Sequence, residues 1–362
     1  MASIRIEHAQ DKDAIAEFVA LHDRVYAARA VRWQSSPLHL PMLRGMTPAT
    51  IDRELRPFVA REGGEVVARV CAVVDGPYLK HWNERIGHLL MFEAQPGARE
   101  AVRQLLDAAC AWLAERGMEA ARIGFGLLET PFTIDDYDAL PPSTLRQNPR
   151  EYHALIKGAG FETERGFVDY AMPALPPLAL RWQSSLESAR RAGFELVPFR
   201  DVPHAQRARR LCELWNATFA SHWGWCPLSP ELSGLFVLDG QPVLETSTFA
   251  LADGEPVGFC FVLPDDASHV DCAPGRELRP GEVRNSLAIG VLPPARGRGV
   301  NYAMAAYGYL ELVRRGWTHV AYTLVLDDNW PSRRTGEGLG GSLCANYVAY
   351  RRELRGAAGG SR

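Results

Sequence analysis

The order of landmarks along the chain occurs twice. In the first half an apolar strand pattern is entered through the turn at Gly63-Gly64, and in the second half a similar pattern is entered through Asp253-Gly254. Each is followed by another apolar strand and by apolar residues at helical spacing, which end at Arg116-Gly117 and at Arg315-Gly316. Equivalent landmarks lie about 180 to 199 residues apart. Because 362 residues are also too many for one compact core, the repetition predicts two tandem domains of the same architecture.

A proline-rich stretch marks the predicted joint between the domains. Three prolines fall within MPALPPLAL, residues 172 to 180, and proline disfavours both helix interiors and central strands. We therefore expect a helix only from 183 to 192, followed by a strand at 194–199. The predicted division is a first domain over 1–171, a linker over 172–182, a second domain over 183–354 and a flexible tail over 355–362.

Composition excludes several classes of protein. Apolar residues make up 47% of the chain and charged residues 23%, which is typical of a globular protein. A formal net charge of -3 argues against nucleic acid as the main partner, because nucleic-acid binding requires a basic surface. No stretch is long and apolar enough to cross a membrane, and the charged N-terminal stretch is unlike a signal peptide.

The seven cysteines are scattered along the chain and form no C-x-x-C pair. This pattern lacks the spacing of a metal site, so we expect no bound metal. We expect reduced, partly buried thiols with structural roles, in a cytoplasmic protein.

The stretch VLPPARGRGVNYA, residues 291 to 303, has the composition of a phosphate-binding loop. Its apolar strand ends at two prolines, which lack backbone donors for sheet pairing. Gly297 and Gly299 permit backbone conformations denied to other residues, so successive amides can converge on one anion at the N-terminus of the following helix. Arg296 and Arg298 add charged donors. The alternative is a glycine-rich turn with two solvated arginines; the strand before the loop and the helix after it favour a diphosphate ligand.

The same residues resemble a known family. VLPPARGRGV, followed by a helix, a strand and DNWPSRR, is similar to the acetyl-coenzyme A binding core of the GCN5-related N-acetyltransferases. Asn301 stands where that family prefers Gly or Ala. The resemblance covers about 194–352, and residues 1–171 resemble the same fold in degenerate form. The residues that fit the family's loop and its later Asn-x-x-Ala/Ser segment are Arg296, Gly299, Asn329 and Ser332.

The resemblance implies an α/β (α+β) fold of two tandem domains, each a mixed, mostly antiparallel twisted sheet flanked by helices. It also implies that acetyl-coenzyme A, or another acyl-coenzyme A, is the donor and that a small-molecule amine attacks its thioester directly. The backbone of Ile289 and Val291 is expected to hold the pantetheine arm, and an amide near Val291 the oxyanion. The residues assigned to the coenzyme are Ile289, Gly290, Val291, Arg296, Gly297, Arg298, Gly299, Val300, Asn301, Asn329, Ser332 and Arg333.

No general acid carries over from the family. Its members often place a tyrosine seven residues after the Asn, and here that position is Gly336. Tyr302 and Tyr347 are the candidates that remain, although each fits better as a packing aromatic. The thiolate could also leave by taking a proton from water, since a thiol is a good leaving group.

The segment SHWGWCP, residues 221 to 227, is expected to contribute to the acceptor site. It is part of a stretch similar to one in a group of poorly characterised tandem transferases. His222 is the candidate base, or else a structural histidine; Trp223 and Trp225 either line an aromatic acceptor pocket or cover the sheet. The first half has no Arg-x-x-Gly beside Pro96-Gly97. It is therefore expected to bind no coenzyme and to act as a scaffold or as one wall of the acceptor site.

The sequence leaves three functions open. The first is an acyl-coenzyme A dependent N-acyltransferase acting on a small amine. The second is a transferase of the same fold that takes its acyl group from a carrier protein or from an aminoacyl donor; the net charge of -3 disfavours a transfer RNA. The third is a non-catalytic protein that binds coenzyme A or a metabolite, which the missing tyrosine allows.

Overall fold

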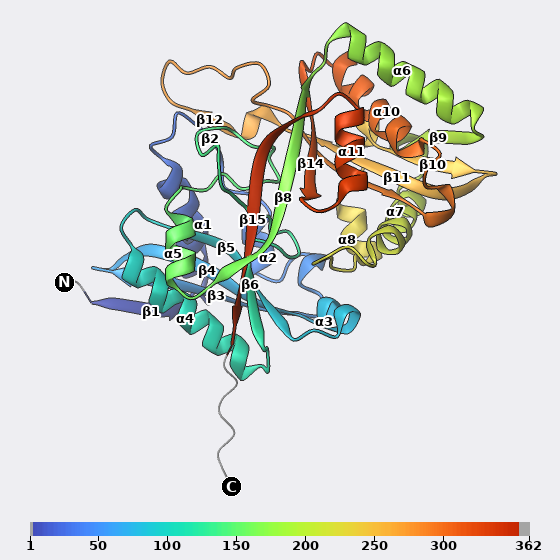
Figure 1. Ribbon diagram of the computed structural model, residues 1–362. Coiled ribbons are helices and arrows are strands. Elements are labelled where there is room, and N and C mark those ends of the chain that lie inside the picture. The colour runs from blue at the N-terminus through green and yellow to red at the C-terminus, as the bar shows by residue number, and fades with distance from the viewer. Residues whose placement is uncertain (1–2, 355–362) are drawn as a thin grey trace.

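The computed structural model describes residues 3–354, and the predicted tail at 355–362 lies outside these described residues. The elements of the first half are β1 (Ile4–His8), α1 (Lys12–Tyr26), β2 (Val31–Trp33), α2 (His39–Leu43), β3 (Arg53–Glu62), β4 (Glu65–Asp75), α3 (Gly76–Trp82), β5 (Ile86–Ala94), α4 (Arg99–Glu115), β6 (Ala120–Ile123), β7 (Phe132–Thr133), α5 (Tyr152–Gly158) and β8 (Glu162–Pro173) (Figure 1).

The second half has a similar but not identical order of elements. Its elements are α6 (Pro176–Arg191), β9 (Phe194–Pro198), α7 (His204–Phe219), α8 (Pro230–Leu235), α9 (Val243–Thr246), β10 (Thr248–Ala252), β11 (Glu255–Pro264), β12 (Val270–Cys272), β13 (Asn285–Val291), α10 (Val300–Arg314), β14 (His319–Leu326), α11 (Trp330–Gly338) and β15 (Ser342–Glu353). Short 3-10 helices lie at Pro48–Thr50, Phe199–Asp201, Ala267–His269 and Pro293–Ala295.

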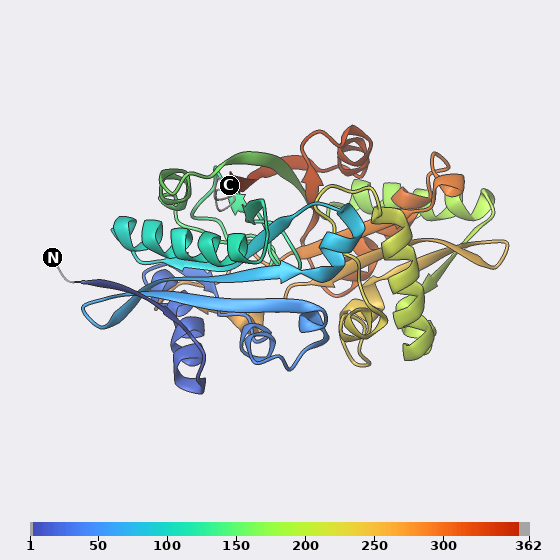
Figure 2. The same cartoon turned by 90° about the horizontal axis from the view of Figure 1, so that it is seen from below.

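Most strand pairs are antiparallel, and only β5 and β6 pair in parallel among the described residues. The large sheet has the order β1-β3-β4-β5-β6-β15-β8-β14, with β7 on β15; a second sheet has the order β13-β11-β10-β9. Helices cover both faces: Figure 2 shows α1 and α4 on opposite sides of the first half's strands. The predicted fold class, a mixed and mostly antiparallel sheet flanked by helices in two tandem halves, is confirmed.

The two halves exchange their last strands. β15, from the end of the chain, lies between β6 and β8 of the first half. β8, from the end of the first half, pairs in turn with β14 of the second. The green β8 and the red β15 therefore run side by side through the middle of the molecule (Figure 1). The backbone ladder is thus continuous across the predicted domain boundary.

The prediction that prolines keep residues 172–182 out of helix and central strand is wrong. β8 stays paired with β14 as far as Pro173, and α6 begins at Pro176. Pro176 and Pro177 occupy the first turn, whose amides have no partner within a helix, so proline is tolerated there. The indole of Trp182 is fully buried and donates to the Leu339 carbonyl at 2.9 Å, which fixes α6 beside α11.

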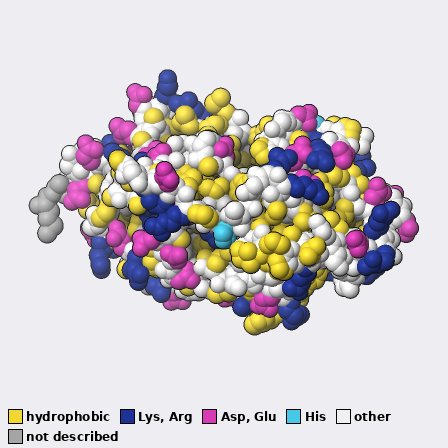
Figure 3. Space-filling model, turned by 90° about the horizontal axis from the view of Figure 1, so that it is seen from above, with side chains coloured by type: hydrophobic (Ala, Val, Ile, Leu, Met, Phe, Trp, Pro, Cys, Tyr) yellow, Lys and Arg dark blue, Asp and Glu magenta, His cyan; other side chains and the backbone are white. Residues whose placement is uncertain are grey.

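The sequence also led to expectations about the cysteines, about metal clusters and about membrane-spanning helices. All seven cysteines are free thiols; five are buried, while Cys272 and Cys344 are exposed. Residues 3–354 contain no cluster of side chains that could hold a metal ion and no helix long and apolar enough to span a membrane. On the face shown in Figure 3, basic and acidic side chains are interspersed.

Candidate functional site

β13 and β14 lie next to each other but diverge. β13 pairs with β11 along its whole length, whereas no backbone ladder within residues 3–354 joins it to β14. At the narrow end, the buried Asn285 donates to the Ala321 carbonyl and accepts from the Ala321 amide, both at 2.9 Å. The Leu287 amide then donates to Thr323 Oγ1 at 2.9 Å. Past this bond, no hydrogen bond between described residues bridges the gap.

The edge of β13 that faces the gap carries unpaired amides. Leu292 donates its amide to the Val257 carbonyl on the opposite side, at 2.8 Å. Because successive amides of a strand point in opposite directions, those of Val291 and Ile289 point into the gap. The Val291 carbonyl accepts a hydrogen bond from Arg296 Nε at 2.9 Å. The edge of β13 therefore offers the amides of two alternate residues, Ile289 and Val291, as donors to an extended ligand.

The loop after β13 presents a row of amides at one helix N-terminus. Gly297 and Gly299 have φ of 75° and 79°, the left-handed region that favours glycine. Among described residues, no acceptor takes the amides of residues 297–302. Apart from the flanking residues, no described atom lies within 4 Å of a Cβ added at either glycine, and residues 297–299 are exposed. The row lies at the positive end of the 15-residue helix α10 and can hold an anion.

Each of the two loop arginines makes one hydrogen bond to a backbone carbonyl. Arg296 is exposed, and it donates one hydrogen bond, to the Val291 carbonyl. Arg298 donates from Nη2 to the Ala192 carbonyl at 2.6 Å and lies over the Phe194 ring, 4.5 Å from its centroid. Both guanidinium groups keep further N–H donors for an anion at the loop.

The residues after β14 hold α11 in place beside the gap. Asn329 is the N-cap of α11, and its side chain accepts from the Ser332 amide at 3.3 Å. Ser332 Oγ shares a hydrogen bond with the Tyr322 hydroxyl at 3.0 Å. Arg333 donates from Nε to the Tyr170 hydroxyl at 3.0 Å. Asn329, Ser332 and Arg333 thus connect α11 to β14 and β8, on the β14 side of the gap.

Neither candidate tyrosine points its hydroxyl freely at the gap. Tyr302 donates to the Arg334 carbonyl at 3.1 Å. Tyr347 is buried, donates to Asp169 Oδ2 at 3.2 Å, and has its pKa raised well above the usual value by burial. Gly336 lies where the family often has tyrosine, and a Cβ there would meet the Tyr170 ring at 3.1 Å. The position therefore lacks space for a large side chain unless its neighbours move.

His222 follows α7 and lies three residues after the end of this helix at Phe219. Thr218 of α7 lies directly against Gly290 of β13. One turn later, the His222 ring packs edge-on against Phe219, with centroids 5.5 Å apart. Burial lowers the pKa of His222; a hydrogen bond to the Trp223 backbone opposes this shift. A neutral imidazole here can act as a base.

The two candidate tryptophans pack against the first half. Trp223 lies beside Phe125, with ring centroids 5.3 Å apart, and Arg122 stacks over it at 4.4 Å. Trp225 is 8% exposed, and its ring meets His81 edge-on at 4.7 Å. Both tryptophans thus join the two halves. Trp223 is the more exposed of the two, and its apolar contacts place it nearer to the end of β14.

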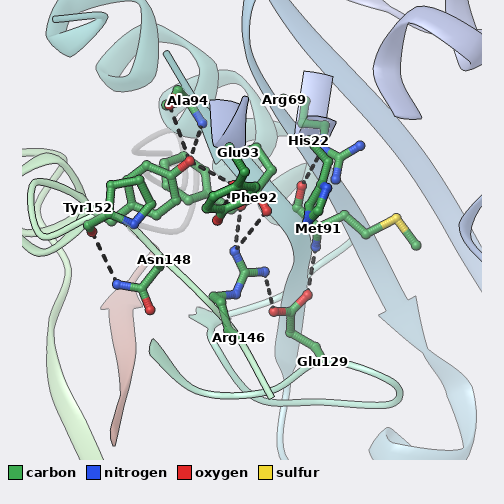
Figure 4. Close-up of polar contacts among 12 residues, drawn as sticks. His22, Arg69, Met91, Phe92, Glu93, Ala94, Glu129, Arg146, Asn148 and Tyr152 are labelled. Atoms are coloured by element: carbon green, nitrogen blue, oxygen red, sulfur yellow. Dashed lines mark hydrogen bonds and ion pairs between the residues drawn. The ribbon is translucent and has the colours of Figure 1, made fainter. Parts of the chain in front are cut away.

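The corresponding gap of the first half is filled by the chain itself (Figure 4). The Ala94 amide, whose place on β5 corresponds to that of Val291 on β13, donates to the Tyr152 hydroxyl at 2.8 Å. The Met91 amide donates to Glu129 Oε2 at 2.6 Å. Arg146 is inserted between them and donates to the Phe92 carbonyl and to Glu129, both at 2.5 Å. The polar groups of this strand edge therefore already have partners.

The first half also supplies a loop to the second. The extra segment over 127–147 lies across the start of β13: the Ser143 amide donates to Asp265 Oδ1 at 2.8 Å, and Arg284 Nη2 donates to the Leu140 carbonyl at 3.1 Å. The loop thus covers the second half next to the narrow end of the gap.

One buried titratable residue beside β14 was not found by sequence reasoning. Asp169 of β8 is 1% exposed and accepts the Leu324 amide of β14 at 2.7 Å. Leu324 has φ of 53° and lies at an irregularity in the pairing of β14 with β8. A single aspartate in an apolar strand gives no sequence signal, because its role depends on which strand packs beside it.

Comparison with known proteins supports the fold. No family model and no curated protein matches the sequence. A tandem GNAT protein from the clavulanic acid biosynthesis pathway is 14% identical, with a TM-score of 0.59, 98% of this chain and 99% of that chain covered. A GCN5-related N-acetyltransferase from Sphaerobacter thermophilus is 15% identical, with a TM-score of 0.56, 97% of this chain and 96% of that chain covered.

A third similar structure is a GCN5-related glucosamine N-acetyltransferase region of a fungal multi-domain GH3 beta-N-acetylglucosaminidase. It is 16% identical, with a TM-score of 0.63, 97% of this chain and 38% of that chain covered. The chain thus has the tandem fold of the GCN5-related N-acetyltransferases, as the sequence predicted. At these identities the likeness concerns the fold.

Proposed function

We propose that the protein is an acyl-coenzyme A dependent N-acyltransferase whose active site lies in the second half, predicted over 183–354. The observation that carries the proposal is the row of open amides at residues 297–302, placed at the wide end of the gap beside β13. A diphosphate fits the amide row, and an amide-bearing arm fits the free edge of the strand. Because the corresponding gap of the first half is filled, the proposal has one site per chain.

The proposed chemistry uses the backbone more than the side chains. Ile289 and Val291 hold the pantetheine arm, and the Val291 amide faces the position where the thioester carbonyl becomes an oxyanion. His222, kept neutral by its lowered pKa, takes the proton from the attacking amine. The tetrahedral intermediate then expels the thiolate. With Gly336 in place of a tyrosine, we propose that water returns the proton to the sulfur.

Calorimetric titration of acetyl-coenzyme A into the wild type and into Gly299→Glu tests the proposal. We expect binding of one molecule per chain in the wild type. The variant introduces a negative charge and a strained left-handed backbone into the amide row, so its affinity should fall at least about tenfold. Gly97→Glu is the matched control: Gly97 has φ of 82° and open space around it, but lies in the half whose gap is filled.

The control variant should bind as tightly as the wild type. Absence of binding in the wild type would exclude the coenzyme site. Equal losses in both variants would mean that the site is in neither loop and that the effect is one of general strain.

A further inference from the structure

A pocket lies between α6 and the N-terminal end of α10, next to the amide row. Its volume is about 350 Å³. α6 follows the predicted boundary between the halves and packs along α10. The residues that line it include Arg181, Ser184, Ser185 and Ser188 from α6, and Arg298 and Gly299 from the loop.

Two positively charged side chains line this pocket, and no negatively charged side chain of the described residues lines it. Arg181 is exposed, and its guanidinium takes part in no ion pair or hydrogen bond with any described residue. Arg298 faces the pocket from the other side, with one of its donors used by the Ala192 carbonyl. No acidic side chain lines the pocket. Two arginines without a carboxylate match a phosphate better than a neutral ligand.

The serines add hydroxyl groups along the same stripe of α6. Ser184 and Ser188 are four residues apart, and Arg181 lies one turn before Ser184, so all three share one face of the helix. Ser188 Oγ donates to the Ser184 carbonyl at 2.9 Å. The hydroxyl of Ser184 has no hydrogen-bond partner among the described residues. It is available to donate to a phosphate oxygen together with Arg181.

Gly299 belongs both to the amide row and to the pocket, so the protein offers two anion positions side by side. The amide row takes a diphosphate under the proposed function. We propose that the α6 pocket binds the 3′-phosphate of the donor's adenosine nucleotide. This inference rests on the proposed function and defines its donor: α6 selects coenzyme A thioesters over thioesters on a carrier-protein arm, which has no nucleotide.

The test compares the affinities of acetyl-coenzyme A and acetyl-dephospho-coenzyme A, which differ only in the 3′-phosphate. For the wild type we expect a ratio of roughly 10 to 100 in favour of the phosphorylated donor, as charged hydrogen bonds provide. Arg181→Ala should lower this ratio toward one, with most of the loss in the affinity for the phosphorylated donor. Arg181→Glu should lower the ratio further, and its negative charge should also weaken the binding of the dephospho compound, because that compound keeps the diphosphate next to the pocket. Higher salt should also lower the ratio for the wild type.

Arg190→Ala is the matched control, because Arg190 is an exposed arginine of the same helix that does not line the pocket. It should keep the wild-type ratio. Equal affinity of the wild type for both donors would overturn this inference while leaving the proposed function intact. Loss of the ratio in Arg190→Ala as well would overturn it too, since the effect would then be one of overall charge. Failure of both donors to bind would overturn the proposed function.

Discussion

Both carboxyl oxygens of Asp169 accept hydrogen bonds, Oδ1 from the Leu324 amide and Oδ2 from the Tyr347 hydroxyl. Burial nevertheless raises the pKa of Asp169 from 3.8 to about 7, although these bonds and the charge of Arg284 lower it. The folded state therefore keeps a proton that the unfolded state releases from about pH 4 upward. It follows that the free energy of unfolding decreases as the pH rises from about 4 to 7.

Replacing Asp169 by Asn should remove this dependence. The amide oxygen of Asn can still accept the Leu324 amide, while the side chain no longer ionises. We expect wild type and Asp169→Asn to differ little near pH 4, and the variant to be the more stable above pH 7. The predicted difference is on the order of 4 kcal/mol, from about three pKa units. Urea unfolding at a series of pH values measures it.

Asp266→Asn serves as the control for the sign. A hydrogen bond from Ser268 lowers the pKa of the exposed Asp266, so its contribution to stability is present above about pH 4 and is lost as the pH falls. Its replacement should therefore act in the opposite direction. A stability difference between Asp169→Asn and wild type that stays constant from pH 4 to 8 would contradict the raised pKa.

The sequence identified the residues whose chemistry is intrinsic to their type. Gly297 and Gly299 were predicted as left-handed positions because few other residues adopt them, and both have positive φ. Arg181 and Asp169 were missed. An exposed arginine on a helix and one aspartate in a strand can be recognised as candidate functional residues only from neighbours that are far away in the sequence.

Elements were predicted well where their periodicity is local. The paired strands and the helices that end at Arg-Gly in each half are present in the structure. The start of α6 was misplaced, because the same prolines that break a helix interior are tolerated in its first turn. The divergence of β13 from β14 cannot be read from the residue pattern of either strand, since both strands are apolar. It depends on which side chains form hydrogen bonds between them.

Asn285 joins the two strands at the narrow end of the gap. Its side chain satisfies both backbone groups of Ala321, and it is fully buried. Asn285→Ala would leave a buried N–H and a buried C=O without partners, so we expect a loss of about 2–5 kcal/mol in the free energy of unfolding. Chemical denaturation measures the loss.

The matched control for Asn285→Ala is Asn346→Ala, which removes an amide that donates to Asp135 near the surface. This variant should lose less than about 1 kcal/mol. Equal losses in the two variants would mean that the bridge at Ala321 does not hold the strands together.

The two halves share one architecture but differ at the edge of the central strand of each half. In the second half the strand edge is open, whereas in the first half side chains and a long loop fill the equivalent gap and extend to the second half. The sequence predicted the tandem architecture. It did not predict the strand exchange, because an apolar strand pattern specifies burial on a sheet but leaves the neighbouring strand undefined.

The strand exchange predicts that neither half folds alone. A fragment ending at residue 174 lacks β15, which leaves β6 and β8 without the strand between them, and the remaining fragment lacks β8 beside β14. Unpaired strand edges and exposed apolar faces should make each fragment aggregate or lose cooperative unfolding. We expect the two fragments to form a complex when refolded together, with a single thermal transition close to that of the intact protein.

The control is the full chain cleaved at a protease site inserted between Ala174 and Leu175, which lie between β8 and α6. The cleaved protein should stay associated during size-exclusion chromatography, because the exchanged strands hold its two pieces together through backbone hydrogen bonds in the central sheet. A monomeric 1–174 fragment that unfolds cooperatively on its own would show that β15 is dispensable for the first half, and the continuous sheet would then be a contact between two independent domains.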